Sequence, residues 1–150
     1  MITDVLHIGV TVKDIDRSIT FYRDVMGLAF QGEILMEGPE TDLLFRRKDC
    51  KARVAYLSGD KTLSGPPVEL IQFIPSDIEE DPADLFKTSI SEICFETDDI
   101  WEEYRRMKEL GVEFLSEPQE FDFTPYGFGK SMALYFKDPD GIILELIEKM

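Results

Sequence analysis

Four side chains with metal-binding chemistry stand at corresponding positions of two similar stretches of the chain. His7 opens the stretch HIGVTVKDI and Glu92 opens EICFETDDI, while Glu69 and Glu145 are the glutamates of VELI and LELI. Imidazole nitrogen and carboxylate oxygen bind borderline and hard cations, and four such ligands with two waters make an octahedral Lewis-acid site. Each residue alone fits an ordinary structural role, but their equivalence favours a shared ion. We therefore predict that these four residues bind one divalent metal ion.

An internal repeat relates the four positions. Three pairs of stretches match, namely residues 7–15 with 92–100, MGLAF at 26–30 with LGVEF at 110–114, and VELI at 68–71 with LELI at 144–147. Because the matches fall at the start, middle and end of each half, they indicate a duplicated module.

Each half is predicted to fold in the order β-α-β-β-β. A β-branched strand near 4–12 leads to Asp14, which is suited to cap a helix that ends at Gly27. In the second half, Asp98 or Asp99 caps a helix that ends at Gly111. The turn signals between the later strands are SGD, SGPP, PYGFG and DPDG.

The predicted organisation is a single domain, 1–150, made of two modules. The first module spans 1–74 and the second spans 89–150, and the proline- and acid-rich stretch 75–88 is the natural linker.

Alternation along the strands predicts which face carries the four residues. Leu6, Ile8, Val10 and Val12 share an apolar face that packs on a helix, and His7 and Thr11 point the other way. Glu69 and Glu145 likewise oppose apolar neighbours. We therefore expect the four predicted ligands to meet on the concave face of the sheet.

The composition indicates a globular protein that acts on a small molecule. The chain has 150 residues, 43% of them hydrophobic, which is enough to bury a core. The formal net charge of −15 repels phosphate, so nucleic acid and anionic membranes are poor partners. The sequence has neither a membrane-spanning apolar run nor a disulfide framework. We expect a cytoplasmic protein.

The whole chain resembles the vicinal oxygen chelate superfamily, which contains glyoxalase I, methylmalonyl-CoA epimerase, extradiol dioxygenases, fosfomycin-resistance enzymes and bleomycin-binding proteins. The resemblance is carried by the strand-initial His7 and by VELI, EICFETDDI and YFKDPDGIILELIE. It implies an α+β fold in which two tandem βαβββ modules form a curved, cup-like mixed sheet with helices on the outer face. It also implies metal ligands at His7, Glu69, Glu92 and Glu145. We expect an isologous homodimer, with the cup closed either within one chain or across the dimer.

Glu92 stands where metal enzymes of this superfamily usually have histidine. A set of one histidine and three glutamates favours Mn²⁺, Fe²⁺, Co²⁺ or Mg²⁺, and Zn²⁺ and Ni²⁺ stay within range. Alternatively, Glu92 does not bind the ion. Because the chain has one histidine, one subunit cannot supply the 2-His-1-carboxylate iron site of extradiol dioxygenases or the two-histidine manganese site of fosfomycin-resistance enzymes.

Signals for the substrates of two branches are missing. Glyoxalase I enzymes hold glutathione with an arginine four residues after the first ligand and an asparagine four after the second, and this chain has Thr11 and Phe73 there. Methylmalonyl-CoA epimerases usually have glutamine where Glu69 stands. The resemblance thus implies a lyase or isomerase of glyoxalase or epimerase type that does not depend on glutathione. Such an enzyme chelates neighbouring oxygens of a small substrate and moves a proton through an enediolate, with Glu145 or Glu69 as the base.

The predicted substrate pocket is largely apolar, and its aromatic residues lie in a loop expected at 117–130. Its residues are Thr11, Ile71, Phe73, Cys94, Phe121, Phe123, Tyr126 and Phe128. The aromatic residues either cover a ligand or form the core of their loop. An alternative function, which the acidity and the aromatics favour, is metal-free binding of a cationic or aromatic molecule, as in bleomycin-binding proteins. A third reading is a domain that keeps only a weak remnant of a metal site.

Overall fold

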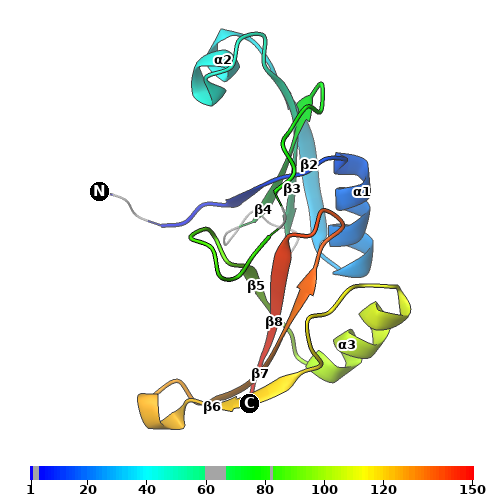
Figure 1. Ribbon diagram of the computed structural model, residues 1–150, viewed down its shortest axis with the longest axis vertical. Helices are drawn as coiled ribbons and strands as arrows, with labels where there is room; N and C mark the ends of the chain where they lie inside the picture. Colours follow the sequence, from blue (N-terminus) through cyan, green and yellow to red (C-terminus); the bar gives the residue numbers. More distant parts are fainter. Residues whose placement is uncertain (2–3, 60–66, 82) are drawn as a thin grey trace. The chain divides into compact units, whose positions relative to one another are not determined.

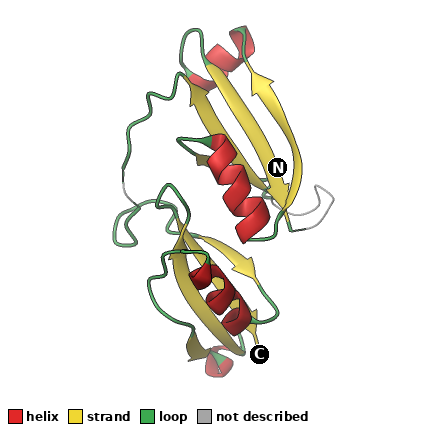
Figure 2. Ribbon diagram, turned by 90° about the vertical axis from the view of Figure 1, so that its right-hand side faces the viewer, coloured by secondary structure: helices red, strands yellow, loops and turns green. Residues whose placement is uncertain are grey.

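Each half of the chain folds as one four-stranded mixed sheet with a helix across one face (Figures 1 and 2). The computed structural model describes residues 1, 4–59, 67–81 and 83–150. They form two compact units, Met1–Glu80 and Asp81–Met150. The predicted α+β class with two tandem modules is confirmed. No helix in these ranges is long and apolar enough to cross a membrane.

The first unit has the strand order β1-β4-β3-β2. Strand β1 runs parallel to β4, and the other neighbours are antiparallel. Its elements are β1 (Ile8–Thr11), α1 (Ile15–Thr20), the π-helical turn η1 (Phe21–Val25), β2 (Ala29–Met36), α2 (Pro39–Phe45), β3 (Lys51–Ser58) and β4 (Val68–Ile74).

The second unit repeats this topology in the order β5-β8-β7-β6, with β5 parallel to β8. Its elements are β5 (Ile93–Glu96), α3 (Ile100–Glu109), β6 (Gln119–Asp122), the 3-10 turn η2 (Thr124–Tyr126), β7 (Lys130–Lys137) and β8 (Ile143–Lys149). The predicted order β-α-β-β-β is therefore confirmed in both halves. Helix α2, between β2 and β3, is an addition that the sequence analysis did not predict.

The helices begin where the sequence predicts; α1 continues as η1 to Val25, shortly before Gly27, and α3 ends at Glu109, shortly before Gly111. The Asp14 carboxylate accepts hydrogen bonds from the backbone N–H groups of Asp16 and Arg17, both at 3.1 Å. In the second unit the cap is Asp99, which accepts from the N–H of Glu102 at 2.8 Å. Such caps satisfy N–H groups that have no partner inside the helix.

The last strand of each unit also holds the start of the helix. The amide oxygen of Gln72 on β4 accepts from the N–H of Ile15 at 2.9 Å. At the repeat-equivalent position, the Glu148 carboxylate on β8 accepts from the N–H of Ile100 at 2.8 Å. These side chains mark the helix-covered face of each sheet, so the residues beside them in sequence face away from the helix.

The core of each unit lies between the sheet and its helix. The buried residues are mainly Val10, Val12, Ile15, Tyr22, Leu57 and Leu70 in the first unit, and Ile100, Met107, Phe136, Leu144 and Leu146 in the second. Burial of each large apolar side chain contributes about 1.5–3 kcal/mol. Because this core occupies one face of each sheet, the opposite face remains for function.

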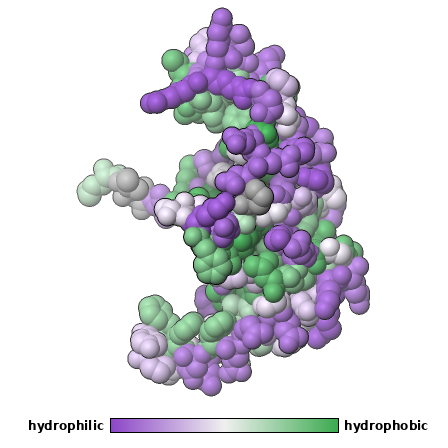
Figure 3. All heavy atoms as spheres, in the orientation of Figure 1, coloured by the Kyte–Doolittle hydropathy of each residue, from purple (hydrophilic) through white to green (hydrophobic). Residues whose placement is uncertain are grey.

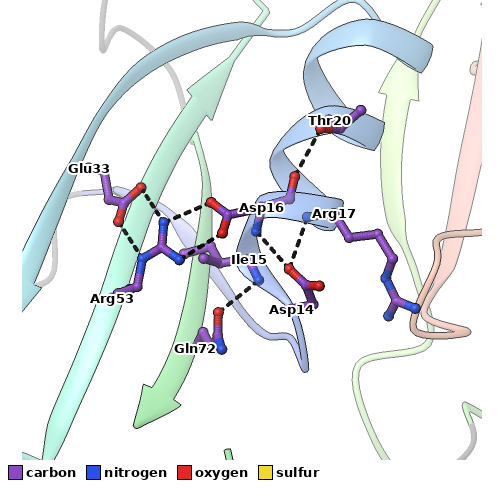
Figure 4. A network of polar contacts seen from close by, with 8 residues as sticks. All are labelled: Asp14, Ile15, Asp16, Arg17, Thr20, Glu33, Arg53 and Gln72. Carbon is purple, nitrogen blue, oxygen red and sulfur yellow. Dashed lines mark hydrogen bonds and ion pairs between the residues drawn. The ribbon is translucent and has the colours of Figure 1, made fainter.

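An ion-pair network ties helix α1 to the sheet of the first unit (Figure 4). Arg53 on β3 donates to both carboxylate oxygens of Asp16 at 2.8 and 3.0 Å. It also donates to Glu33 on β2 at 2.6 and 3.1 Å. The planar guanidinium suits this bridging of two carboxylates.

Two predictions about element boundaries were wrong. The first strand starts at Ile8 rather than near residue 4, and Leu6 is 75% exposed instead of buried. Its partner β4 begins at Val68, opposite Ile8, so the ladder starts there. The predicted loop 117–130 contains strand β6, because residues 119–122 pair with the edge of β7. The predicted turns SGD and SGPP overlap residues 60–66, which lie outside the described residues.

Candidate metal-binding site

The helix-free face of the first sheet brings His7 and Glu69 together. His7 directly precedes β1 and Glu69 lies on β4, with His7 Nε2 3.2 Å from Glu69 Oε2. The Glu69 side chain is 12% exposed and that of His7 is 37% exposed. Gly9 pairs with Glu69 in the parallel register, and a Cβ atom at Gly9 would lie 3.2 Å from the same oxygen. Glycine therefore leaves the space that the carboxylate occupies.

Tyr56 holds the other oxygen of the same carboxylate. It lies opposite Glu69 in the β3–β4 register, and its hydroxyl donates to Glu69 Oε1 at 2.8 Å. Burial, together with the Glu69 carboxylate, raises the pKa of Tyr56 to about 12. Tyr56 therefore stays protonated at neutral pH and keeps its proton for this hydrogen bond.

In the second sheet, Glu145 occupies the position that Glu69 has in the first. It lies on β8, paired with Cys94 of β5 and with Tyr135 of β7. Burial raises the pKa of Glu145; the hydrogen bond with the Cys94 thiol acts in the opposite direction, and the negative charge of Glu92 raises it further. Glu92 directly precedes β5, as His7 precedes β1. Two repelling carboxylates beside each other are a setting that a cation would stabilise.

The Cys94 thiol is a neutral neighbour of this carboxylate. Burial is the main cause that raises its pKa to about 12, with contributions from Glu145, Glu92 and Glu96. Cys94 is therefore a thiol at neutral pH.

The four predicted ligands form two pairs, one in each unit. Among the described residues, no group of three or more His, Cys, Asp or Glu side chains is close enough to hold a metal ion. His7 with Glu69, and Glu92 with Glu145, are thus the pairings that the structure shows.

The sequence profile of the Glyoxalase/Bleomycin resistance protein/Dioxygenase superfamily matches residues 4–146. The chain belongs to this superfamily.

Two proteins with similar sequences match this chain over most of their length. The chain is 29% identical over 143 residues to the uncharacterized protein YwbC of Bacillus subtilis, covering 95% of each chain. It is 28% identical over 145 residues to a probable lactoylglutathione lyase of Vibrio cholerae, covering 96% of this chain and 89% of that one.

Solved structures of the glyoxalase superfamily share the fold. A glyoxalase family protein from Bacillus cereus has a TM-score of 0.85 at 20% identity, over 100% of this chain and 96% of that chain. The trypanothione-dependent glyoxalase I of Leishmania major has a TM-score of 0.71 at 21% identity, over 98% and 87%.

The donor atoms of the first pair fit the divalent metal that the glyoxalase superfamily implies. Two ligand atoms that bind one ion at right angles, each about 2.1 Å from it, lie about 3 Å apart. The separation of His7 Nε2 and Glu69 Oε2 is 3.2 Å. The carboxylate oxygen on the far side is held by Tyr56, an outer partner of the kind that orients metal ligands.

The predicted pocket residues have different surroundings. Cys94 contacts Glu145, and Ile71 lies beside Gly9 on the face of Glu69. Thr11 is exposed at the end of β1, and Phe73 packs edge-to-face on Phe45 of α2, with ring centroids 5.1 Å apart.

The aromatic residues Phe121, Phe123, Tyr126 and Phe128 form an exposed group at the end of the β6–β7 hairpin. Phe121 and Phe123 stack with ring centroids 5.7 Å apart and planes 10° apart. Tyr126 and Phe128 are 77% and 84% exposed. Apolar surface is visible at this end of the second unit (Figure 3).

Tyr56 and Tyr135 are the site residues that the sequence analysis missed. Each lies directly across from a predicted ligand, in the third strand of its unit. The signal was present in the repeat, because AYLS at 55–58 and LYFK at 134–137 align their tyrosines.

Proposed function

We propose that this protein is a metal-dependent lyase or isomerase that acts on a small molecule with two neighbouring oxygens. Membership of the glyoxalase superfamily and the similarity to proteins named lactoylglutathione lyase support this class of reaction. The observation that carries the proposal is the matching placement of Glu69 and Glu145. Each lies near the start of the last strand of its unit, on the helix-free face, with a tyrosine opposite it.

The proposal gives each of the four residues a role. His7, Glu69, Glu92 and Glu145 are ligands of a divalent metal ion; Mn²⁺, Fe²⁺, Ni²⁺, Co²⁺ and Zn²⁺ all accept such donors. When bound, the ion polarises neighbouring substrate oxygens and so acidifies an adjacent C–H group. Glu145 or Glu69 takes and returns the proton. The raised pKa of Glu145 favours it as the base, because a carboxylate accepts a proton better as its pKa rises.

We further propose that the substrate is not a glutathione adduct. Glyoxalase I enzymes, by the resemblance above, use an arginine and an asparagine at the positions of Thr11 and Phe73. Neither residue here carries a cationic or amide group, and Phe73 is engaged with Phe45. The predicted test is an assay with the hemithioacetal of methylglyoxal and glutathione, compared with α-hydroxy-carbonyl and acyl-CoA substrates. Turnover of the hemithioacetal above the others would contradict this part of the proposal.

The metal is tested first, by elemental mass spectrometry of protein purified without added metal. We expect about one equivalent per site in the wild type, and loss of the metal from the His7→Ala and Glu145→Ala variants. The matched control is Glu109→Ala, which removes an exposed carboxylate from helix α3 and should leave the metal content unchanged. Wild-type protein that stays metal-free after loading with Mn²⁺, Ni²⁺, Zn²⁺ or Fe²⁺ would contradict the proposal that the protein is a metal-dependent enzyme.

The alternative function is metal-free binding of an aromatic or cationic molecule. Two observations favour it, namely the net charge of −15 and the stacked, exposed pair Phe121 and Phe123. Exposed aromatic faces bind cations and planar ligands. If no metal binds, fluorescence titration with aromatic cations, compared between the wild type and Phe123→Ala, tests this function.

We propose an isologous homodimer as the assembly, the commonest form of symmetric oligomer. Sedimentation equilibrium of the purified protein tests it, and a mass of 17.3 kDa at all concentrations would contradict it.

A further inference from the structure

Tyr56 controls how Glu69 can present its two oxygens. The hydroxyl donates to Oε1 at 2.8 Å, and Oε2 faces His7 Nε2 at 3.2 Å. Each oxygen of the carboxylate thus has a polar neighbour, and the Glu69 side chain is largely buried, with 12% of it exposed. A hydrogen bond to a carboxylate inside such a partly buried site is stronger than one in water.

The equivalent glutamate in the second unit is held differently. Tyr135 lies opposite Glu145 just as Tyr56 lies opposite Glu69, but among the described residues no hydrogen bond joins its hydroxyl to Glu145. The side chain beside Glu145 is Cys94, whose thiol donates to the Phe95 carbonyl at 3.9 Å. The residue that corresponds to Cys94 in the first unit is Gly9, which has no side chain to offer. The duplicated module has therefore given Glu69 and Glu145 different neighbours.

We propose that Tyr56 is a positioning residue that fixes Glu69 as a one-oxygen metal ligand through Oε2, and that Tyr135 has no matching role toward Glu145. With Oε1 occupied by the Tyr56 hydroxyl, Oε2 is the oxygen left for an ion shared with His7 Nε2. This inference rests on the proposed function for the metal, while the orientation of the carboxylate by Tyr56 stands independently of it.

The test compares Tyr56→Phe with the matched variant Tyr135→Phe, which removes the same hydroxyl from the equivalent strand position. Metal-free proteins are titrated with Mn²⁺ and Ni²⁺ by calorimetry. Loss of an outer partner of a metal ligand typically weakens affinity 10- to 100-fold, so we expect about a tenfold loss in Tyr56→Phe. We expect a change of no more than about twofold in Tyr135→Phe, since no such bond is lost there. Thermal denaturation of the metal-free proteins separates this effect from loss of folding.

Crystal structures of the metal-free wild type and Tyr56→Phe give a second readout that needs no metal. The wild type should keep Glu69 Oε2 near His7 Nε2, and the variant should show the carboxylate turned away. Equal losses of affinity in both variants, or an unmoved carboxylate in Tyr56→Phe, would overturn the inference. Wild-type protein that binds neither ion refutes the proposed function and the ligand role, and the crystal comparison alone then decides whether Tyr56 orients Glu69.

Discussion

Gly9 and Cys94 hold the same register position in the two sheets, Gly9 directly beside Glu69 and Cys94 directly beside Glu145 of the neighbouring parallel strand. A Cβ atom at Gly9 would lie 3.2 Å from Glu69 Oε2 and 3.5 Å from Ile71 Cδ1. At Cys94, a side chain is present and contacts Glu145 instead. The first unit thus keeps its glutamate close to the strand by leaving out a side chain, and the second adds one.

The first prediction is that Gly9→Ala weakens metal binding without unfolding the protein. The added methyl group is close to Oε2, so the carboxylate must shift by a few tenths of an ångström from the position in which it faces His7. We expect about a fivefold or greater loss of Ni²⁺ affinity, within the range seen when ligand orientation is disturbed. The free energy of unfolding should change by less than about 1 kcal/mol, because alanine also lowers the entropy of the unfolded chain.

The control for this prediction is Gly59→Ala. A Cβ atom at Gly59 would meet no atom of the described residues within 4 Å, so this variant carries the same chemical change at a more open position. Calorimetric titration of both variants with Ni²⁺ makes the comparison. Equal affinities in Gly9→Ala and the wild type would show that the close approach to Glu69 does not govern the orientation of the carboxylate.

The second prediction concerns the DPDG turn between β7 and β8. One oxygen of the buried Asp138 carboxylate, Oδ1, accepts from the N–H groups of Asp140 and Ile142, both at 2.9 Å. Asp138→Ala leaves two backbone donors without this acceptor and should lower the free energy of unfolding by about 2 kcal/mol. Asp138→Asn keeps an oxygen at Oδ1 and should lose less than half as much. Urea denaturation measures the free energy of unfolding of both variants. Equal losses in Asp138→Ala and Asp138→Asn would show that the negative charge of Asp138, rather than the acceptor oxygen, causes the effect.

The sequence was sufficient for the pattern of faces and for the equivalence of the two halves, because the first follows from alternation and the second from the repeat. The side-chain period of two placed His7 and Glu69 on one face, and the structure brings them to 3.2 Å. Leu6 shows where this reasoning stops. Alternation says which face a residue has if it is in a strand, but the length of the strand depends on the partner, and β4 starts only at Val68.

Other features needed information on cross-strand neighbours that one sequence does not give. The hydrogen bond from Tyr56 to Glu69 depends on the antiparallel register of β3 and β4, which the turn residues between them would have to fix. Helix α2 was missed although Pro39 at its first position is a helix-start signal. The candidate metal ligands were therefore predicted more readily than the neighbouring residues that orient them.

The third prediction is an acid-dependent loss of stability through Asp16. The hydrogen bonds from Arg53 hold the pKa of Asp16 below its usual value. Because the folded pKa is the lower one, this stabilisation is present above the unfolded pKa and is lost as the pH falls through the folded pKa. The carboxylate is largely exposed, so solvent screening limits the contribution to about 1 kcal/mol or less.

Urea denaturation of the wild type and Asp16→Asn at pH 7 and pH 3 measures this contribution. We expect the variant to be less stable at pH 7 and the difference to narrow at pH 3. The control is Glu40→Gln, a neutralised carboxylate on helix α2 rather than α1. A difference for Asp16→Asn that does not change with pH would show that the ion pair with Arg53 is not its cause.

The fourth prediction is that Glu92→Gln lowers the pKa of Glu145. Burial of Glu145 is the main cause of its raised pKa and is unchanged by this variant, but the repulsion from the Glu92 charge is removed. The pKa should therefore fall part of the way toward the ordinary value for glutamate and remain above it. Carboxyl ¹³C chemical shifts of the metal-free protein, followed against pH, measure it directly.

The matched control for this measurement is Glu96→Gln, a neutral substitution on the same strand β5. Glu96 contributes to the raised pKa of Cys94, whereas the like charge that acts on Glu145 is Glu92. We therefore expect a clear downward shift in Glu92→Gln and a much smaller one in Glu96→Gln. Equal shifts would mean that Glu145 responds to the net negative charge of its surroundings rather than to Glu92, and Glu92 would then lose its support as the partner of Glu145 in a metal site.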